Sequence, residues 1–284
     1  MKIEKVCVVG SGMMGRQIAL NTAKYGYEVN VTDSNAAVLE DMGRWAEDYL
    51  AGRVAKGRMS AEEAEGVKGR LHRISSFAEA VKDADLVIEA AFEDEGVKHG
   101  IFKQLNEYAP KKAILTTNSS AMVSSTFSPD IEDSSRLANL HYFNPALVME
   151  LVEIVRNPET SDETVEALLE FARKTGKSPI VVQKELEKFI ANRIITAIQN
   201  EAFWLVENGY CTVEEVDTAC EKGCGHKMGP FRTKDLTGID RNFLMMQAQY
   251  DKTGVKPSGY DLFRKYYEAG RYGRKTGHGF YDYE

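Results

Sequence analysis

The chain has 284 residues, of which 43% are hydrophobic and 28% are charged, as in ordinary globular proteins. This length supports a large core and one or two domains. The formal net charge of −7 argues against a nucleic-acid partner, because binding a phosphate backbone needs a basic face. The charge leaves room for an anionic small molecule, which a local group of Lys and Arg side chains can hold.

No apolar run approaches the roughly 20 residues needed to cross a membrane, and the N-terminus leads into a predicted strand without a signal peptide. The four cysteines are too few and too unevenly placed for a disulfide framework. We therefore expect a cytoplasmic protein with no membrane contact. Cys220, Cys224 and His226 lack a second ligand pair, so we expect no metal site, and buried thiols on a helix are the simpler interpretation.

The first half of the chain alternates short apolar runs with amphipathic segments, a pattern typical of parallel strands joined by helices. Strands are predicted at residues 6–9, 28–32, 86–90, 113–116, 137–140, 151–155 and 179–182. Helices are predicted over residues 13–25 and 162–175. The charged segment from 35 to 73 has large apolar residues at roughly helical spacing, and we expect a helical pair that projects from the sheet.

Strand signals stop near residue 185, and helical patterns dominate from there on. Phe189–Asn208 is predicted to be a long helix, and Thr212 to be the N-cap of the next one. The expected organisation is a doubly wound, mostly parallel α/β domain over residues 1–184, followed by a smaller all-α domain over residues 185–284.

A glycine-rich turn lies between the first predicted strand and the first predicted helix. It reads Gly10-Ser11-Gly12-Met13-Met14-Gly15. The first glycine permits a tight turn, the second lets backbone amides approach a pyrophosphate, and the third allows close helix–sheet packing. Asp33 ends the next strand, where its carboxylate can bind the adenine ribose and repel the extra phosphate of NADP. The glycines alone could simply form a turn, but the combination predicts a Rossmann-type domain that binds NAD.

His141 and Glu153 are candidates for acid–base chemistry. An imidazole can move a hydroxyl proton near neutral pH, and a carboxylate can hold its tautomer and stabilise its charged form. Ser120 and His141 each follow a predicted strand, at the edge where open α/β sheets bind ligands, and Asn192 lies near the start of the long helix. Taken singly, these side chains also have structural interpretations, such as capping the backbone or the helix N-terminus.

Motifs along nearly the whole chain resemble those of 3-hydroxyacyl-CoA dehydrogenases, most nearly the short single-function 3-hydroxybutyryl-CoA dehydrogenases. The matching segments are Gly10–Gly15, Val87–Ala90, Asn118–Ser120, His141–Pro145, Leu151–Glu153, Phe189–Arg193, Met228–Pro230 and Gly273–Tyr281. The resemblance implies reversible oxidation of an (S)-3-hydroxyacyl-CoA, expected to be 3-hydroxybutyryl-CoA, with NAD. It also implies a homodimer and a helical domain that completes the substrate cleft.

The resemblance implies catalytic and substrate roles for individual residues. His141 would be the general acid and base, and Glu153 would orient it and stabilise the imidazolium. Ser120 would hydrogen-bond the reacting oxygen, and Asn192 would bind substrate oxygens or position the histidine. Asn144 would support the nicotinamide side of the cofactor site.

Charged residues at other matching positions would contact the cofactor or CoA. Glu93, Lys98 and Lys275 match cofactor contacts, with a solvated charged surface as the alternative. CoA carries phosphates that need cations, which Arg53 and Lys56 in the helical projection would supply, with the neighbouring Arg58. A solvated face is again the alternative.

The segment before the long helix departs from the family pattern. Family members commonly have Pro-Gly there, whereas this chain has Leu186-Glu187-Lys188. Glu and Lys favour a continued helix, so we expect a different linker and a shifted Asn192. The departure keeps open a dehydrogenase of a non-CoA hydroxy acid, such as carnitine or a sugar acid. A non-catalytic dinucleotide-binding protein is the other alternative, but it would need none of the four candidate catalytic residues.

Overall fold

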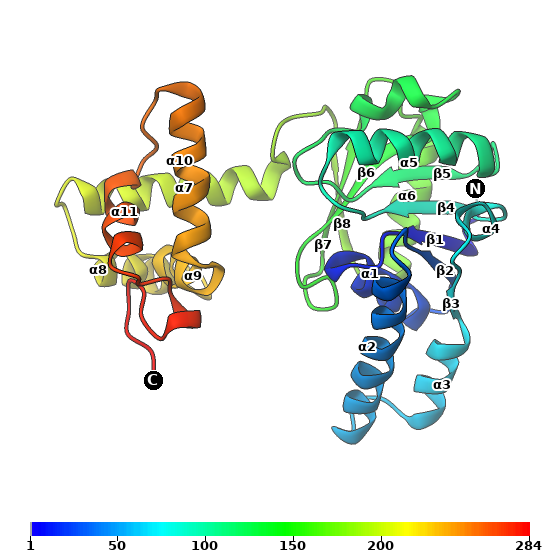
Figure 1. The fold of residues 1–284 in the computed structure, drawn as a ribbon, viewed down its shortest axis with the longest axis horizontal. Coiled ribbons are helices and arrows are strands. Elements are labelled where there is room, and N and C mark those ends of the chain that lie inside the picture. Colours follow the sequence, from blue (N-terminus) through cyan, green and yellow to red (C-terminus); the bar gives the residue numbers. More distant parts are fainter. Residues whose placement is uncertain (1) are drawn as a thin grey trace. The chain divides into compact units, whose positions relative to one another are not determined.

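The structure is a computed structural model that describes residues 2–284. It divides after Ile190 into two compact units (Figure 1). The first is an α/β unit, and the second, Ala191–Glu284, is helical.

A single eight-stranded sheet forms the centre of the α/β unit, with the order β3-β2-β1-β4-β5-β6-β7-β8. In chain order its strands are β1 (Lys5–Val9), β2 (Glu28–Thr32), β3 (Leu71–Arg73), β4 (Leu86–Glu89), β5 (Ile114–Thr117), β6 (Leu137–Tyr142), β7 (Leu151–Arg156) and β8 (Ser178–Val182). Neighbouring strands run parallel except at β6 and β7, which pair antiparallel. Every residue of β4, β5 and β6 is buried, as expected for strands covered on both faces.

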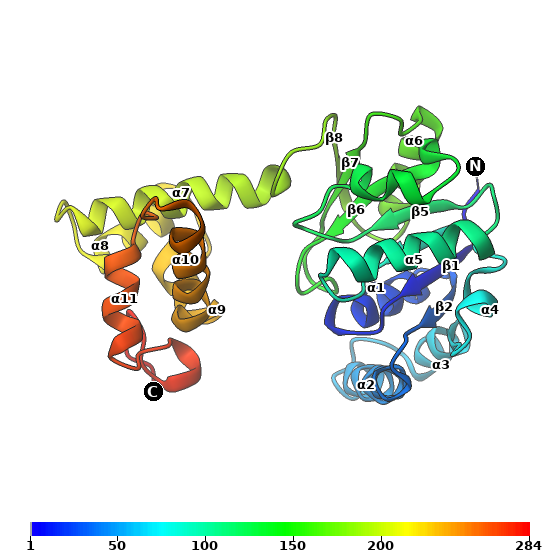
Figure 2. The same ribbon diagram turned by 45° about the horizontal axis from the view of Figure 1, so that its top comes forward.

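Helices cover both faces of this sheet (Figure 2). The helical segments of the unit are α1 (Met13–Lys24), α2 (Ala36–Ala55), α3 (Ala61–Gly69), α4 (Phe77–Val81), α5 (Glu95–Tyr108), η1 (Ser124–Asp130), η2 (Ser134–Arg136) and α6 (Asp162–Lys174). One face packs on α1, α2, α3 and α6, and the other on α4, α5 and η1. The predicted doubly wound, mostly parallel fold is therefore confirmed.

The helical projection ends earlier than the sequence pattern predicted. The α2–α3 pair extends from the sheet (Figure 1), but Leu71–Arg73, expected to be helical, forms the edge strand β3. Pairing with β2, in which Leu71 faces Val29, holds this short strand. Three residues are too few to show a periodicity, so the prediction was wrong there because tertiary pairing decides their conformation.

The linker before the second unit also differs from the prediction. Glu187 and Lys188 form a turn and do not continue a helix, and Lys188 and Phe189 have positive φ angles of 65° and 52°. Phe189 is only 1% exposed and packs with Val155 and Val182. Burial of this ring fixes the backbone and overrides the helix propensity of the residues before it.

The helical unit is organised around an aromatic core. Its segments are α7 (Phe189–Glu207, which begins at the end of the first unit), α8 (Val213–Thr218), η3 (Ala219–Gly223), α9 (Pro230–Thr237), α10 (Ile239–Thr253), α11 (Tyr260–Glu268) and η4 (Arg274–Thr276). The rings of Phe203, Phe231, Phe263 and Phe280 pack at centroid distances of 4.9 to 5.4 Å. The predicted N-cap of α8 is confirmed, because Thr212 and Glu215 form a capping box.

Two carboxylates lie inside the helical unit, each 1% exposed. Asp217 accepts hydrogen bonds from two amides of the first turn of α9 and from the hydroxyl of Tyr281, at 2.8 to 3.0 Å. Asp235 accepts from two amides of the C-terminal segment and from the hydroxyl of Tyr283, over the same range. These two side chains therefore cap one helix and fasten the C-terminal segment to the core.

The thiols of the helical unit are less buried than expected. Cys220 is partly buried, and Cys224 is exposed beyond the π-helical turn η3, so the prediction of buried thiols was wrong. Within residues 2–284, no three His, Cys, Asp or Glu side chains gather in a way that could hold a metal ion. No helix in the same range is long and apolar enough to cross a membrane.

Candidate active site

The glycine-rich turn joins β1 to α1 and leaves the N-terminus of α1 without a side-chain cap. Gly10 has a φ of 98°, and a Cβ there would lie 2.7 Å from the backbone of Ala90. A Cβ on Gly15 would lie 1.8 Å from the carbonyl oxygen of Gly10, whereas one on Gly12 would meet nothing within 4 Å. Packing therefore requires Gly10 and Gly15, and Gly12 leaves the space that a pyrophosphate needs near the helix amides.

Asp33 lies at the end of β2, beside this turn. One carboxylate oxygen accepts from the amide and hydroxyl of Ser11 at 2.7 and 3.0 Å, and the other from the amide of Asn35 at 2.9 Å. Met13 is 60% exposed at the first position of α1, and Met14 packs partly on the core. The first turn of α1 contains no acidic residue that would repel phosphate. The residues present thus fit NAD, with the pyrophosphate at the helix and the ribose at Asp33.

A buried charge network follows β4. Lys98 is 1% exposed, and its Nζ lies 2.6 Å from Oε1 of Glu89 and 3.3 Å from Oε2 of Glu93. Thr117 donates to the other oxygen of Glu89 at 2.6 Å. Burial excludes the alternative that Lys98 is a solvated cation. The Glu93 side chain is 42% exposed and is the member of the network that can face a ligand.

Glu89 was missed as a candidate residue in the sequence analysis. It is fully buried at the end of β4 and accepts from the amide of Ala91 at 2.7 Å. The available signal was an acidic residue at the end of an apolar strand, which needs a partner when it is buried.

His141 and Glu153 face each other across the antiparallel pair β6–β7. Nδ1 of His141 lies 2.9 Å from Oε2 of Glu153, and the two residues are 4% and 0% exposed. We had expected His141 to follow the strand, but β6 extends to Tyr142 and His141 lies inside it. Directly opposed residues have their side chains on the same face of a sheet, so the antiparallel register of β6 and β7 places these two side chains next to each other.

Aromatic rings and the start of α7 surround the pair. The ring centroids of Phe143 and Phe189 lie 4.6 and 5.3 Å from that of His141. The second oxygen of Glu153 accepts from the amide of Ile190 at 3.1 Å. Among the described residues, Nε2 of His141 has no hydrogen-bond partner, so this nitrogen is available to a ligand.

The loop after β5 separates two serines that are adjacent in sequence. Ser119 is buried, hydrogen-bonds to Glu93 and accepts from the amides of Ala121 and Met122. Ser120 is exposed, and no other residue in the described part of the chain is hydrogen-bonded to its hydroxyl. Of the two, Ser120 is therefore the one that can bind a substrate oxygen.

The remaining candidates are Asn144, Asn192 and Lys275. Asn144 is exposed after the end of β6. Asn192 belongs to the helical unit, on α7, as does Lys275, whose Nζ lies 2.6 Å from a carboxylate oxygen of Asp240. The α/β unit thus contains both the His141–Glu153 pair and the charge network, whereas Asn192 and Lys275 belong to the helical unit.

The basic residues of the projection lie at the end of α2. Lys56 is the C-cap residue and is exposed, and within residues 2–284 its amine has no ion-pair partner. Arg53 donates to the carbonyl oxygen of Arg58 at 3.4 Å. In the part of the chain that the structure describes, no carboxylate pairs with Arg53 or Lys56, so both cations can receive an anion.

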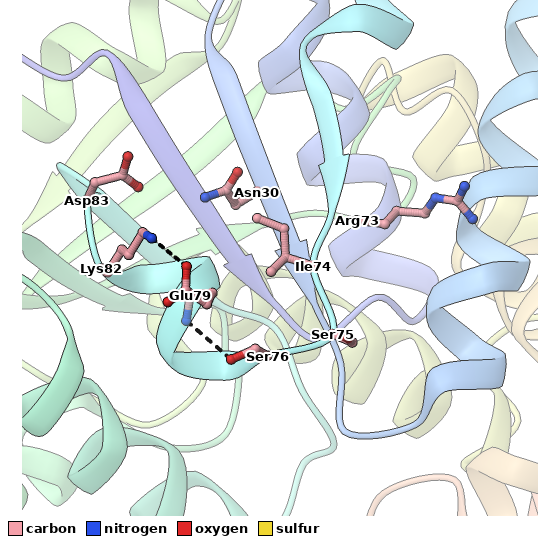
Figure 3. A pocket seen from close by; sticks show the side chains of 8 residues that line it. All are labelled: Asn30, Arg73, Ile74, Ser75, Ser76, Glu79, Lys82 and Asp83. Carbon is pink, nitrogen blue, oxygen red and sulfur yellow. Dashed lines mark hydrogen bonds and ion pairs between the residues drawn. The ribbon is translucent and has the colours of Figure 1, made fainter.

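A surface cavity of about 560 Å³ lies beside β3 and α4 (Figure 3). Lys82 forms an ion pair with Glu79, and Ser76 caps α4. The cavity contains none of the predicted site residues, and its charged side chains are paired with each other or with residues nearby, as Arg73 is with Glu40 and Asp83 with Lys5. We assign it no role.

Two family profiles together match almost the whole chain. The profile of the 3-hydroxyacyl-CoA dehydrogenase NAD-binding domain matches residues 5–186, and that of the C-terminal domain matches residues 189–283. The chain belongs to the 3-hydroxyacyl-CoA dehydrogenase family. It is therefore an NAD-dependent dehydrogenase with a Rossmann-type first domain, as the sequence motifs predicted.

Individual relatives are similar to this chain over nearly their full length. The chain is 35% identical to a probable 3-hydroxyacyl-CoA dehydrogenase of Caenorhabditis elegans, covering 100% of this chain and 94% of that protein. It is 36% identical to a 3-hydroxybutyryl-CoA dehydrogenase of Bradyrhizobium diazoefficiens, with 99% and 96% covered. The crystal structure of (S)-3-hydroxybutyryl-CoA dehydrogenase from Ralstonia eutropha matches with a TM-score of 0.88 and 31% identity, covering 100% of both chains.

Proposed function

We propose that this protein interconverts (S)-3-hydroxybutyryl-CoA and acetoacetyl-CoA, with His141 and Glu153 as its acid–base pair. The observation that carries the proposal is the buried histidine whose Nδ1 lies against Glu153 and whose Nε2 has no hydrogen-bond partner within residues 2–284. A neighbouring loop offers the free hydroxyl of Ser120. Names of relatives at 31% and 36% identity, both 3-hydroxybutyryl-CoA dehydrogenases, support the short acyl chain.

Gly10–Gly15 and Asp33 would hold NAD, which would supply the hydride acceptor for the oxidation. Nε2 of His141 takes the proton of the 3-hydroxyl group in the oxidation and returns it in the reduction. Glu153 holds the imidazole by Nδ1 and stabilises the imidazolium that forms. Ser120 donates to the C3 oxygen, and Asn192 contributes a further polar contact to the substrate or to His141.

In this proposal the remaining polar and charged residues contact NAD or the phosphates of CoA. Glu93 and Asn144 contact NAD. Lys98 supports that side of the site through its ion pairs with Glu89 and Glu93. Lys275 would reach the cofactor only by leaving Asp240. Lys56 and Arg53 bind phosphates of CoA, because they are cations with no carboxylate partner among the described residues.

Oxidation of NADH with acetoacetyl-CoA tests the proposal directly. We expect turnover with this substrate and none with carnitine and NAD. His141→Ala should abolish turnover while NADH binding, measured by its fluorescence, is retained. Turnover of carnitine without turnover of acetoacetyl-CoA would exclude the proposed substrate, and loss of NADH binding in His141→Ala would make the histidine a structural residue.

The CoA contact has a test of its own. Lys56→Ala should raise KM for acetoacetyl-CoA and leave kcat unchanged, because it removes a contact to a part of the substrate that does not react. A truncated substrate, acetoacetyl-N-acetylcysteamine, has no phosphates and serves as the matched control. An equal KM effect on both substrates would contradict phosphate binding by Lys56.

We further infer that the protein is a cytoplasmic homodimer that assembles through the helical domain. Exposed apolar side chains on that unit include Ile194, Trp204, Leu244 and Met245, which a partner surface would cover. All four cysteines are free, which suits a reducing compartment. Light scattering in solution should give twice the mass of one chain, and a monomer would exclude the assembly.

A further inference from the structure

One polar residue is placed in the middle of the buried strand β6. Asn139 is 0% exposed and pairs in the sheet with Thr117 of β5. Its Oδ1 accepts from the amide of Ser124 at 2.7 Å, and its Nδ2 donates to the carbonyl oxygens of Met122 and Ser119 at 2.9 and 3.4 Å. The buried amide is thus satisfied entirely by the loop that carries Ser120.

Asn139 and His141 lie on the same face of β6. Leu137 packs in the cluster with α5, whereas Ala138 and Leu140 pack in the cluster on the opposite face, so residues 137, 139 and 141 share the first face. Asn139 therefore lies two residues before the proposed acid–base histidine and on the same face of the strand. Its hydrogen-bond partners, Ser119, Met122 and Ser124, lie on both sides of Ser120 in the chain.

A second asparagine connects the same two segments in the opposite direction. Oδ1 of Asn118, in the loop, accepts from the backbone amide of Tyr142, in the strand, at 2.9 Å. Ser119 closes the turn between them by accepting from the amides of Ala121 and Met122 at 3.2 and 2.8 Å. Asn118, Ser119, Ala121 and Met122 are thus held by hydrogen bonds on both sides of Ser120, whose hydroxyl has no partner among the described residues.

This arrangement matters if Ser120 and His141 act on the same oxygen. A serine on an irregular loop has no ladder of hydrogen bonds to fix its position, and a displacement of about 1 Å can cost about a hundredfold in rate. The amide of Asn139 supplies the missing connection, because it ties the loop backbone to the strand that holds the histidine.

We propose that Asn139 is a positioning residue that holds the Ser120 loop in register with His141. It does not touch the substrate. It acts by fixing the distance between a hydroxyl on one strand end and an imidazole on the next strand. The inference rests on the proposed roles of Ser120 and His141.

Asn157, which directly follows β7, provides a matched control. Its side chain contacts the first residue of β6, at the end of that strand away from Ser120. It is 4% exposed, donates to the carbonyl oxygen of Leu137 at 2.9 Å, and accepts from the amides of Glu159 and Thr160 at 2.7 and 2.8 Å. It is therefore a buried asparagine with as many hydrogen bonds as Asn139, but it holds a loop that lies at the far end of β6 from Ser120.

The first experiment compares Asn139→Ala with Asn157→Ala. Both should lower the melting temperature, because each leaves buried backbone groups unpaired. Only Asn139→Ala should lower kcat with acetoacetyl-CoA, by about tenfold to a hundredfold, with KM for NADH unchanged. Equal kcat values in the two variants at equal folded fraction would overturn the proposal.

A double-mutant cycle with Ser120→Ala separates positioning from a general weakening. If Asn139 acts through the hydroxyl of Ser120, Asn139→Ala should have little further effect on kcat once Ser120 is alanine. Effects that multiply fully would show that Asn139 acts by another route and would overturn the proposal.

Hydrogen exchange of the loop peptide gives a readout that needs no substrate. Amides from Ser119 to Ser125 should exchange faster in Asn139→Ala than in Asn157→Ala. Unchanged exchange would overturn the anchoring whatever the enzyme acts on. A wild-type protein that is inactive on acetoacetyl-CoA would instead refute the proposed substrate, while the exchange result would still decide the role of Asn139 in holding the loop.

Discussion

Both units bury carboxylates, but they give them different partners. In the α/β unit, Glu89 and Glu153 face side chains that can carry charge, Lys98 and His141. In the helical unit, Asp217 and Asp235 accept hydrogen bonds of 2.8 to 3.0 Å from backbone amides and tyrosine hydroxyls, and the charged Arg232 lies 3.9 Å from Asp217. Amides cannot exchange a proton with a ligand near neutral pH, whereas an imidazole can. We therefore expect Glu153 to serve chemistry, Glu89 to support the neighbouring charge network, and the two carboxylates of the helical unit to serve folding.

The largest effect should come from Glu153→Gln. The change keeps the size of the side chain but removes the charge that stabilises an imidazolium, so kcat should fall by about a hundredfold to a thousandfold. Binding of NADH, followed by fluorescence, should not change. Near-normal turnover in this variant would mean that Glu153 has a structural role like that of Asp217 and Asp235, and would contradict the proposed difference between the two units.

Asp235→Asn should show the opposite profile. An amide nitrogen would replace one acceptor facing the backbone amides and the hydroxyl of Tyr283, so the free energy of unfolding should fall by about 2–3 kcal/mol. Urea denaturation measures the loss, and kcat per folded molecule should be unchanged. A large drop in kcat with unchanged stability would assign Asp235 to the chemistry.

Glu89→Gln should reduce stability by about 2 kcal/mol, because it leaves the buried ammonium of Lys98 with only the partly exposed Glu93. Adding Lys98→Met removes the unpaired charge and should restore most of the loss. Thermal melts of the single and double variants provide the comparison. If the double variant were no more stable than Glu89→Gln alone, the unpaired ammonium would not be the cause of the loss.

The smallest effect concerns Lys234, which has no ion-pair partner among residues 2–284. Burial lowers the pKa of Lys234 from 10.5 to about 8, and its Nζ donates to Oδ1 of Asn242 at 2.8 Å. Between pH 8 and 10.5 the unfolded chain binds the proton and the folded chain has released it, so stability from this group rises with pH in that window. Below pH 8 both states are protonated and the contribution is constant.

Lys234→Met removes this dependence and leaves the other titrating groups in place. Relative to the variant, the wild-type protein should gain about 1–2 kcal/mol of unfolding free energy on going from pH 7.5 to 10.5. Chemical denaturation at a series of pH values measures the difference. Parallel curves for the two proteins would mean that Lys234 is solvated.

The sequence revealed those features that depend on local pattern. The glycine turn, Asp33 and the order of strands and helices follow from spacing that is visible in one segment at a time. His141 and Glu153 were identified as a pair, but their geometry comes from antiparallel pairing of β6 with β7, which no local pattern specifies.

Features set by contacts distant in sequence could not be predicted. Leu71–Arg73 is a strand because β2 is beside it. Lys188 adopts a positive φ because Phe189 must be buried, although Glu and Lys favour a helix. Asn139 stood within an apolar run, and only the path of the loop after β5 reveals what its amide does.

The antiparallel turn between β6 and β7 has a consequence for variation in this protein. Because the ladder decides which residues are opposite each other, His141 and Glu153 stay paired whatever the length of the connection from Phe143 to Glu150. That connection can gain or lose residues without separating the two. A single residue inserted within either strand would instead turn one partner to the opposite face of the sheet. Tolerance to insertion should therefore change abruptly at Tyr142 and Leu151.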